Sequence, residues 1–209
     1  MDSTTTVFEY TAAMASSAPA PGGGGASALV GAVGASLGSM AANLTTGKKK
    51  YLVVEDDMRR IAARCEELRA RLLELASADE TAFLPLSKMY SLPKDTPGYA
   101  EAFLDASLKA CGPAREMLKC CCEAIDLLDE AAEKCSRLML SDVACGAANC
   151  RAALQGAALN IFVNTKNVRG NAAADALEAE VNAALAEYLP RADAVTSRIL
   201  EALKGTAHG

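Results

Sequence analysis

Apolar residues recur every three or four positions through most of this 209-residue chain, which is the spacing of one buried face of an α-helix. The clearest stripe falls within residues 52–90 and consists of Val54, Met58, Ile61, Cys65, Leu68, Leu72 and Leu75. The same pattern predicts helices over residues 7–17, 26–46, 99–140 (with a break at Gly112-Pro113), 142–168, 172–189 and 192–203. Because no segment alternates like a strand, the sequence predicts an all-α fold, a bundle of long helices.

Residues 26–47 form a segment without any charged side chain, composed mostly of Ala, Gly and Ser. Gly31, Gly34 and Gly38 are spaced three and four apart, so they lie on one face of the predicted helix. Each glycine costs a helix about 1 kcal/mol relative to alanine, and the usual compensation is another backbone close by or room for a ligand. We therefore expect this helix at the centre of the bundle. A membrane-spanning helix is disfavoured because large aliphatic residues are few.

Length and charge narrow the class of protein. A chain of 209 residues fits one domain, spanning 1–209, with a sizeable core. The net charge is −5 and no basic surface stands out, so nucleic acid is not an expected partner. The first ten residues, MDSTTTVFEY, lack the basic start and apolar core of a secretory signal. We expect a cytoplasmic protein with no membrane partner.

Cysteine and histidine usage argues against metal and nucleophilic chemistry. None of the eight cysteines forms a CxxC pair, and the single histidine, His208, is next to the C-terminus. Neither a zinc site nor a Ser-His-Asp triad nor a Cys-His pair is therefore expected, and the cysteines are predicted to be reduced, buried thiols. Carboxylates, lysines, tyrosines and amides remain, a set that suits proton transfer at a carbon–nitrogen centre.

A polar face on the predicted helix over 142–168 is a candidate binding surface. Asp142 and Asn160 are eighteen residues apart, which is five turns, so they lie on one line along the helix. The same narrow face carries three further amides, Asn149, Asn164 and Asn167. Buried amides need partners, so this face is predicted to meet either another helix through a polar seam or a polar ligand. Ser141 or Asp142 also suits the N-cap of this helix.

A second carboxylate continues the apolar stripe of residues 52–90. Extending that stripe past Leu75 gives Asp79 and then Phe83, which puts an aspartate on a core-facing line. Either Asp79 faces a pocket, or the helix is ending and Asp79 faces water.

Several blocks of sequence carry a resemblance to a known family. They are PAPGGGGASA at 19–28, ANLTTGKKKY at 42–51, ADETAF at 78–83 with SLPK at 91–94, SD at 141–142 and NIFVNTK at 160–166. In this order they resemble the formiminotetrahydrofolate cyclodeaminase and methenyltetrahydrofolate cyclohydrolase family, and the likeness covers nearly the whole chain. One departure is that the family's loop commonly reads PGGGS, whereas Ala26 precedes Ser27 here.

The resemblance implies an all-helical, homodimeric enzyme of one-carbon folate chemistry, with no cofactor beyond its tetrahydrofolate substrate. In the cyclodeaminase reaction, N10 of 5-formiminotetrahydrofolate attacks the formimino carbon, giving 5,10-methenyltetrahydrofolate and ammonia. The alternative, the cyclohydrolase reaction, adds water to the methenyl carbon and opens the ring to 10-formyltetrahydrofolate. Both reactions need a base, an acid and a carboxylate near the cation. A non-catalytic helical interaction module is the competing class.

The resemblance also implies roles for individual residues. Asp142 is the first choice for proton transfer or cation stabilisation, and Asp79 is the second. Asn160 and Asn164, one turn apart, are candidates for the amide and amino edge of the pterin. The other substrate-binding candidates are Lys48, Lys49, Lys50, Lys94 and Lys166 for the carboxylates of a mono- or polyglutamylated folate, Gly22, Gly23 and Gly24 for an anion at a helix N-terminus, and Asn43. The lysines at 48–50 equally suit a helix C-terminus, and the glycine run equally suits a tight turn.

Overall fold

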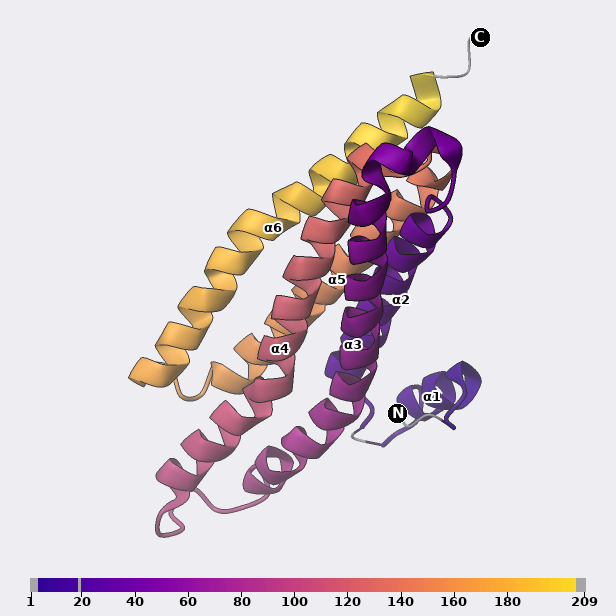
Figure 1. Ribbon diagram of the computed structural model, residues 1–209. Coiled ribbons are helices and arrows are strands. Elements are labelled where there is room, and N and C mark those ends of the chain that lie inside the picture. Colours follow the sequence, from indigo (N-terminus) through magenta and orange to yellow (C-terminus); the bar gives the residue numbers. More distant parts are fainter. Residues whose placement is uncertain (1–3, 19, 206–209) are drawn as a thin grey trace.

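A computed structural model describes residues 4–18 and 20–205 of the chain, and these residues contain helices and no strand (Figure 1). The prediction of an all-α fold is confirmed. The α-helices are α1 (Val7–Met14), α2 (Gly23–Asn43), α3 (Glu55–Met89), α4 (Tyr99–Lys134), α5 (Leu140–Thr165) and α6 (Ala172–Gly205), with short 3-10 helices η1 (Lys49–Val54) and η2 (Arg137–Met139).

Helix α2 is the central element, because it packs against α3, α4 and α5, while α6 covers the outer side of α4 and α5 (Figure 1). The glycine face of α2 makes this packing possible. A Cβ atom at Gly34 would lie 2.5 Å from Cys150 Sγ and 2.9 Å from the carbonyl oxygen of Gly146. The backbones of α2 and α5 therefore approach each other closely, as the glycine spacing predicted.

One face of α2 is nevertheless exposed, which corrects the expectation of a buried helix. Its exposed apolar residues are Val30, Val33, Met40 and Leu44. By length and composition α2 is the one helix of the described residues able to cross a membrane, but half of its most apolar 18-residue stretch is buried inside the protein. That burial against α3, α4 and α5 is typical of the core helix of a helical bundle.

Two predicted helix breaks are wrong. Helix α4 continues through Gly112-Pro113, and α6 continues through Pro190. A proline inside a helix costs about 3 kcal/mol. Core packing next to each proline offsets that cost, because the fully buried Ala114 follows Pro113 and the fully buried Ala192 follows Pro190. Tertiary contacts thus override the local preference of the chain.

Helix boundaries differ from prediction at two places that matter for the site. Helix α2 begins at Gly23, inside the glycine run, and not after it. Helix α5 begins at Leu140 with Met139 as its N-cap, so neither Ser141 nor Asp142 caps it. Asp142 instead lies in the first turn, where its negative charge interacts favourably with the helix dipole.

All eight cysteines belong to the described part of the chain and are unpaired. Six are buried, Cys120 is half-buried and Cys145 is exposed, so the prediction of buried thiols holds for six of the eight. Burial raises the pKa of the Cys65, Cys111 and Cys150 thiols to about 12, which keeps them protonated and unreactive. His208 lies outside the described residues.

Candidate functional site

A cavity of about 400 Å³, here called the Asp79 cavity, opens at the N-terminal end of α2. It is lined by residues from α2, α3, α4 and α5: Ala20, Gly22, Gly23, Gly24, Asp79, Glu80, Phe83, Tyr90, Ala110, Asn160, Val163, Asn164 and Lys166. Seven of the residues that the sequence singled out thus line one cavity, although they come from three distant blocks of the chain. A few polar groups in a partly apolar cavity are typical of a small-molecule site.

Asp79 sits against the first turn of α2. The backbone N–H of Gly25 donates to its carboxylate, and a Cβ atom at Gly24 would lie 2.2 Å from Asp79 Oδ2. The anion at this helix N-terminus is therefore the protein's own side chain, and Gly24 is small because the carboxylate occupies the space beside it. Asp79 therefore faces a pocket and not bulk water, which is one of the two alternatives that the sequence left open.

The pKa of Asp79 is raised above the ordinary range of an aspartate. Burial is the largest cause, the hydrogen bond from Gly25 opposes it, and the charge of Glu80 adds to the rise. A carboxyl group whose pKa is moved towards neutrality is better suited to give and take protons at physiological pH.

Tyr10 packs against Gly25 in the first turn of α2, beside the residues that line the cavity, and it was not predicted from the sequence. Its side chain is 3% exposed, and its hydroxyl lies where a Cβ atom of Gly25 would be, at 2.2 Å. Burial, followed by the charges of Glu80 and Asp79, raises the pKa of Tyr10 to about 12, so the hydroxyl stays protonated beside these two carboxyl groups. The short helix α1 that carries Tyr10 is fixed by a capping box between Thr6 and Glu9.

Two amides of α5 face the same cavity. Asn160 donates from Nδ2 to the carbonyl oxygen of Gly156 at 2.8 Å, which fixes the orientation of its side chain beside Gly23. Asn164, one turn later, is 8% exposed and lines the cavity, as does Lys166 at the end of the helix. These two amides are positioned to present donors and acceptors to a polar heterocycle.

The polar face of α5 divides between a helix–helix seam and an open cavity. Its first half is a helix–helix seam, where Gly146 packs against Gly34 of α2. Farther along, Gly156 accommodates Ser27, whose hydroxyl donates to the carbonyl oxygen of Gly23 at 2.7 Å. Its last half reaches the cavity through Asn160 and Asn164.

Lys94 lies near the same end of the bundle, between α3 and α4, whereas the remaining predicted site residues lie at the opposite end. Asp142 precedes Asn160 by eighteen residues, or roughly 27 Å along α5. Lys48 donates to Ser136 Oγ at 3.4 Å, and Ser136 N–H donates to Thr45 Oγ1 at 2.9 Å. These bonds link the segment after α2 to the segment between α4 and α5. Lys49 and Lys50 adjoin it in η1, and Asn43, the last residue of α2, donates to Ser39 Oγ at 3.3 Å. One chain therefore holds its two candidate carboxylates at opposite ends.

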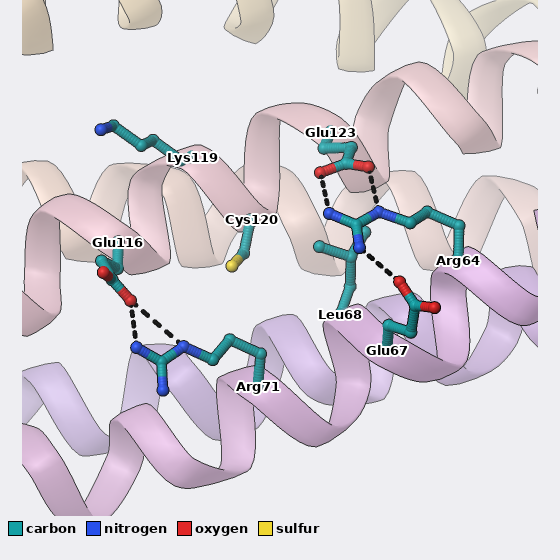
Figure 2. A pocket seen from close by; sticks show the side chains of 8 residues that line it. All are labelled: Arg64, Glu67, Leu68, Arg71, Glu116, Lys119, Cys120 and Glu123. Atoms are coloured by element: carbon teal, nitrogen blue, oxygen red, sulfur yellow. Dashed lines mark hydrogen bonds and ion pairs between the residues drawn. The ribbon is translucent and has the colours of Figure 1, made fainter.

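A charged groove between α3 and α4 is a less suitable site (Figure 2). Its carboxylates are engaged by arginines, since Arg64 bonds Glu123 and Glu67 while Arg71 bonds Glu116. Cys120 lies between these pairs, and burial raises the pKa of its thiol. Charges that already satisfy one another leave no group in this groove ready to transfer a proton.

Comparison with known proteins identifies relatives over most of the chain. Residues 6–183 match the sequence model of the formiminotransferase-cyclodeaminase family. The chain is 38% identical over 203 residues to a methenyltetrahydrofolate cyclohydrolase of Methylorubrum extorquens, covering 95% of this chain and 96% of that protein. It is 29% identical over 189 residues to the formimidoyltransferase-cyclodeaminase of Sus scrofa, but spans 34% of that longer protein.

A solved structure has the same fold. The crystal structure of a formiminotetrahydrofolate cyclodeaminase from Thermotoga maritima superposes with a TM-score of 0.81 at 27% identity, over 97% of each chain.

Proposed function

The chain belongs to the formiminotransferase-cyclodeaminase family and is an enzyme of one-carbon folate chemistry, and we propose that its main reaction is the hydrolysis of 5,10-methenyltetrahydrofolate to 10-formyltetrahydrofolate. One observation favours this reaction over the cyclodeaminase reaction that heads the sequence-based expectation. The cyclohydrolase relative is 38% identical and matches end to end, whereas the Sus scrofa protein is 29% identical and mostly outside the match.

Cyclodeamination of 5-formiminotetrahydrofolate is the second candidate. It is supported by the Thermotoga maritima structure, which shares the fold over 97% of its length. Both reactions form or break a bond at the same one-carbon bridge between N5 and N10, so one cavity serves either. They differ in the nucleophile, which is water in the first and N10 in the second.

In the proposed mechanism Asp79 moves the proton. Its ionised carboxylate accepts a proton from the water that attacks the methenyl carbon, which gives a hydroxyl group on that carbon. The carboxylic acid then returns the proton to N5 as the bond between that carbon and N5 breaks, and the hydroxyl group releases its proton to solvent as the formyl carbonyl forms. The buried location of Asp79 and its raised pKa support this role. The adjacent Glu80, which also lines the cavity, adds negative charge near the cationic substrate.

Asn160 and Asn164 bind the pterin in this proposal. Both amides line the cavity beside Asp79, and Phe83 and Val163 supply apolar walls for the ring. A site that pairs each polar edge of the heterocycle discriminates strongly against rings lacking those edges, because unpaired buried groups are costly.

We further propose a homodimer formed through the exposed stripe of α2. That stripe is continued on α5 by Leu159 and Val163, both exposed. An uncharged apolar face of this kind is a suitable two-fold interface. An axis crossing α2 and α5 near their middles would bring the end of one subunit that carries Lys48–Lys50 and Asp142 beside the Asp79 cavity of its partner. The two separated groups of candidate residues would then form one composite site.

The proposed location is the cytoplasm, and the proposed substrate is a mono- or polyglutamylated folate. Eight unpaired cysteines support a reducing compartment. Lysines at both ends of the bundle support binding of the glutamate carboxylates.

Assays of the purified protein against both folates test the proposed function. We expect the protein to convert 5,10-methenyltetrahydrofolate faster than the spontaneous reaction does. The conversion is measured as the loss of the absorbance of the methenyl bridge. If ammonia is released from 5-formiminotetrahydrofolate faster than the methenyl substrate is hydrolysed, cyclodeamination is the main reaction and hydrolysis the second. Absence of turnover and of calorimetric binding with both folates would favour the non-catalytic module.

A further inference from the structure

A second cavity of about 420 Å³, here called the Lys94 cavity, adjoins the first. It is lined by Tyr90, Lys94, Tyr99, Ala100, Phe103, Asn167 and Val168, and it shares Tyr90 with the Asp79 cavity. It lies where α3 and α4 extend beyond the rest of the bundle and are joined by residues 90–98 (Figure 1). Lys166 of the first cavity and Asn167 of the second are consecutive residues, so the two cavities adjoin just after the end of α5.

The wall of the Lys94 cavity is aromatic and fixed in place. Tyr99 and Phe103 stack with ring centroids 5.6 Å apart at 21°, and Tyr90 meets the edge of Phe103 at 5.6 Å and 77°. The hydroxyl of Tyr99 donates to the carbonyl oxygen of Met89 at 3.3 Å. Phe103 is 8% exposed while Tyr90 is 50% exposed, so the cluster has a buried base and an open face on which a flat ring can pack.

The charge of this cavity is positive. Lys94 is the one charged residue among the described residues that line it, and no carboxylate lines it. An aromatic face beside an exposed ammonium suits a ligand that has a flat ring followed by a carboxylate.

We infer that the Lys94 cavity binds the aminobenzoyl-glutamate half of the folate, with the benzoyl ring on Tyr90 and Tyr99 and the glutamate carboxylates at Lys94. This inference rests on the proposed folate reaction. A folate has a polar bicyclic head, then a flat benzoyl ring, then carboxylates. The lining follows the same order, from Asn160 and Asp79 through Tyr90 to Lys94.

The length of α2 separates the two groups of lysines within one chain. Lys48–Lys50 follow the C-terminal end of α2, and the Asp79 cavity is at its N-terminal end; 21 residues of helix separate them by about 30 Å. Within one chain, the first glutamate of a folate whose head lies by Asp79 therefore reaches Lys94 and not Lys48–Lys50.

Binding of p-aminobenzoylglutamate and its triglutamate, measured by calorimetry on the full chain at low salt, tests this inference without requiring turnover. Lys94→Gln is expected to weaken triglutamate binding about two- to fivefold, as for an exposed ion pair, and added salt should reduce the difference. Tyr90→Leu is expected to weaken both ligands. Lys88→Gln is the matched control, because Lys88 is exposed on the same end of α3 and lines neither cavity, and it should bind like the wild type.

Steady-state kinetics with the folate substrate provide a second test. Lys94→Gln should raise KM for triglutamylated substrate with kcat unchanged, since Lys94 is distant from the bridge carbon. If Lys94→Gln behaves like Lys88→Gln, or if replacing Lys48, Lys49 and Lys50 together carries the whole loss, the inference is overturned while the folate reaction stands. A wild-type protein that neither binds nor converts any reduced folate overturns the proposed function and this inference together.

Discussion

Replacing Asp79 with asparagine should separate catalysis from stability. The change keeps the size of the side chain, and its Oδ1 atom still accepts the hydrogen bond from Gly25. It removes the group that is proposed to move the proton. General acid–base groups typically contribute ~10²–10⁴-fold in rate, so we expect kcat to fall by that factor.

Asp79→Asn is expected to lower activity but not stability. Because burial raises the pKa of Asp79 in the folded protein, its protonated form is favoured there. The stabilising effect of that protonation is complete below the pKa of the unfolded chain and is lost as the pH rises through the folded pKa. At neutral pH the ionised Asp79 therefore destabilises the fold, and the neutral asparagine should leave the melting temperature unchanged or raise it.

The assay compares kcat and thermal melting for Asp79→Asn, Asp56→Asn and the wild type. Asp56 is an exposed aspartate in the first turn of the same helix, far from the cavity, and its variant should keep full activity. As the pH is lowered, the activity of the wild type should begin to fall at a pH above the ordinary titration range of aspartate. The residual activity of Asp79→Asn should not show this fall. Full activity in a folded Asp79→Asn protein would exclude Asp79 from the mechanism, and a large loss of melting temperature would make its role structural.

Four further predictions follow from particular contacts. Tyr10→Phe removes the buried hydroxyl beside Glu80 and Asp79 and should lower kcat/KM about fivefold, the effect of one polar interaction of about 1 kcal/mol; unchanged kinetics would exclude Tyr10 from the site. Gly34→Ala should lower the melting temperature by several degrees in calorimetry, because overpacking costs about 1–3 kcal/mol and the gain in helix propensity is only about 1 kcal/mol; an unchanged melting temperature would show that α5 can move away. Val33→Glu places a charge in the exposed stripe of α2 and should give a folded monomer by light scattering; a persistent dimer would locate the interface elsewhere. If the site is composite, Asp79→Asn and Asp142→Asn should each be inactive alone but recover about a quarter of wild-type activity when mixed as subunits of a two-fold dimer, whereas no recovery would separate Asp142 from the site.

Much of the fold could be predicted because helical packing has a sequence period. The apolar stripe of α3 was visible as spacings of three and four, and Met58, Ile61 and Leu72 are indeed fully buried. The breaks expected at Pro113 and Pro190 were wrong because proline acts on its own turn, whereas core packing acts over the whole helix. Local rules are least reliable where long-range packing is strongest.

The candidate site could be predicted in part. Asp79 was identifiable because it continues an apolar stripe, and Asn160 and Asn164 because they share a polar face. Periodicity gives the angle of a residue around its helix but not which other helices meet it at that height, so Asp142 and Asn160 were grouped although they lie at opposite ends of α5. Tyr10 gave no signal, because nothing in an eight-residue amphipathic helix indicates that it docks on a glycine of α2.

The close crossing of α2 and α5 has a consequence for how the protein is made. Gly34 and Gly146 are more than 100 residues apart in sequence, yet each fills the space that a side chain of the other would need. During synthesis α2 leaves the ribosome first and has no α5 to pack against until most of the chain has followed. Its glycine face and its apolar stripe are both open to water in that interval, when a nascent chain is most prone to aggregate. Chains interrupted before α5 should therefore depend on chaperones, whereas the completed chain can bury its central helix.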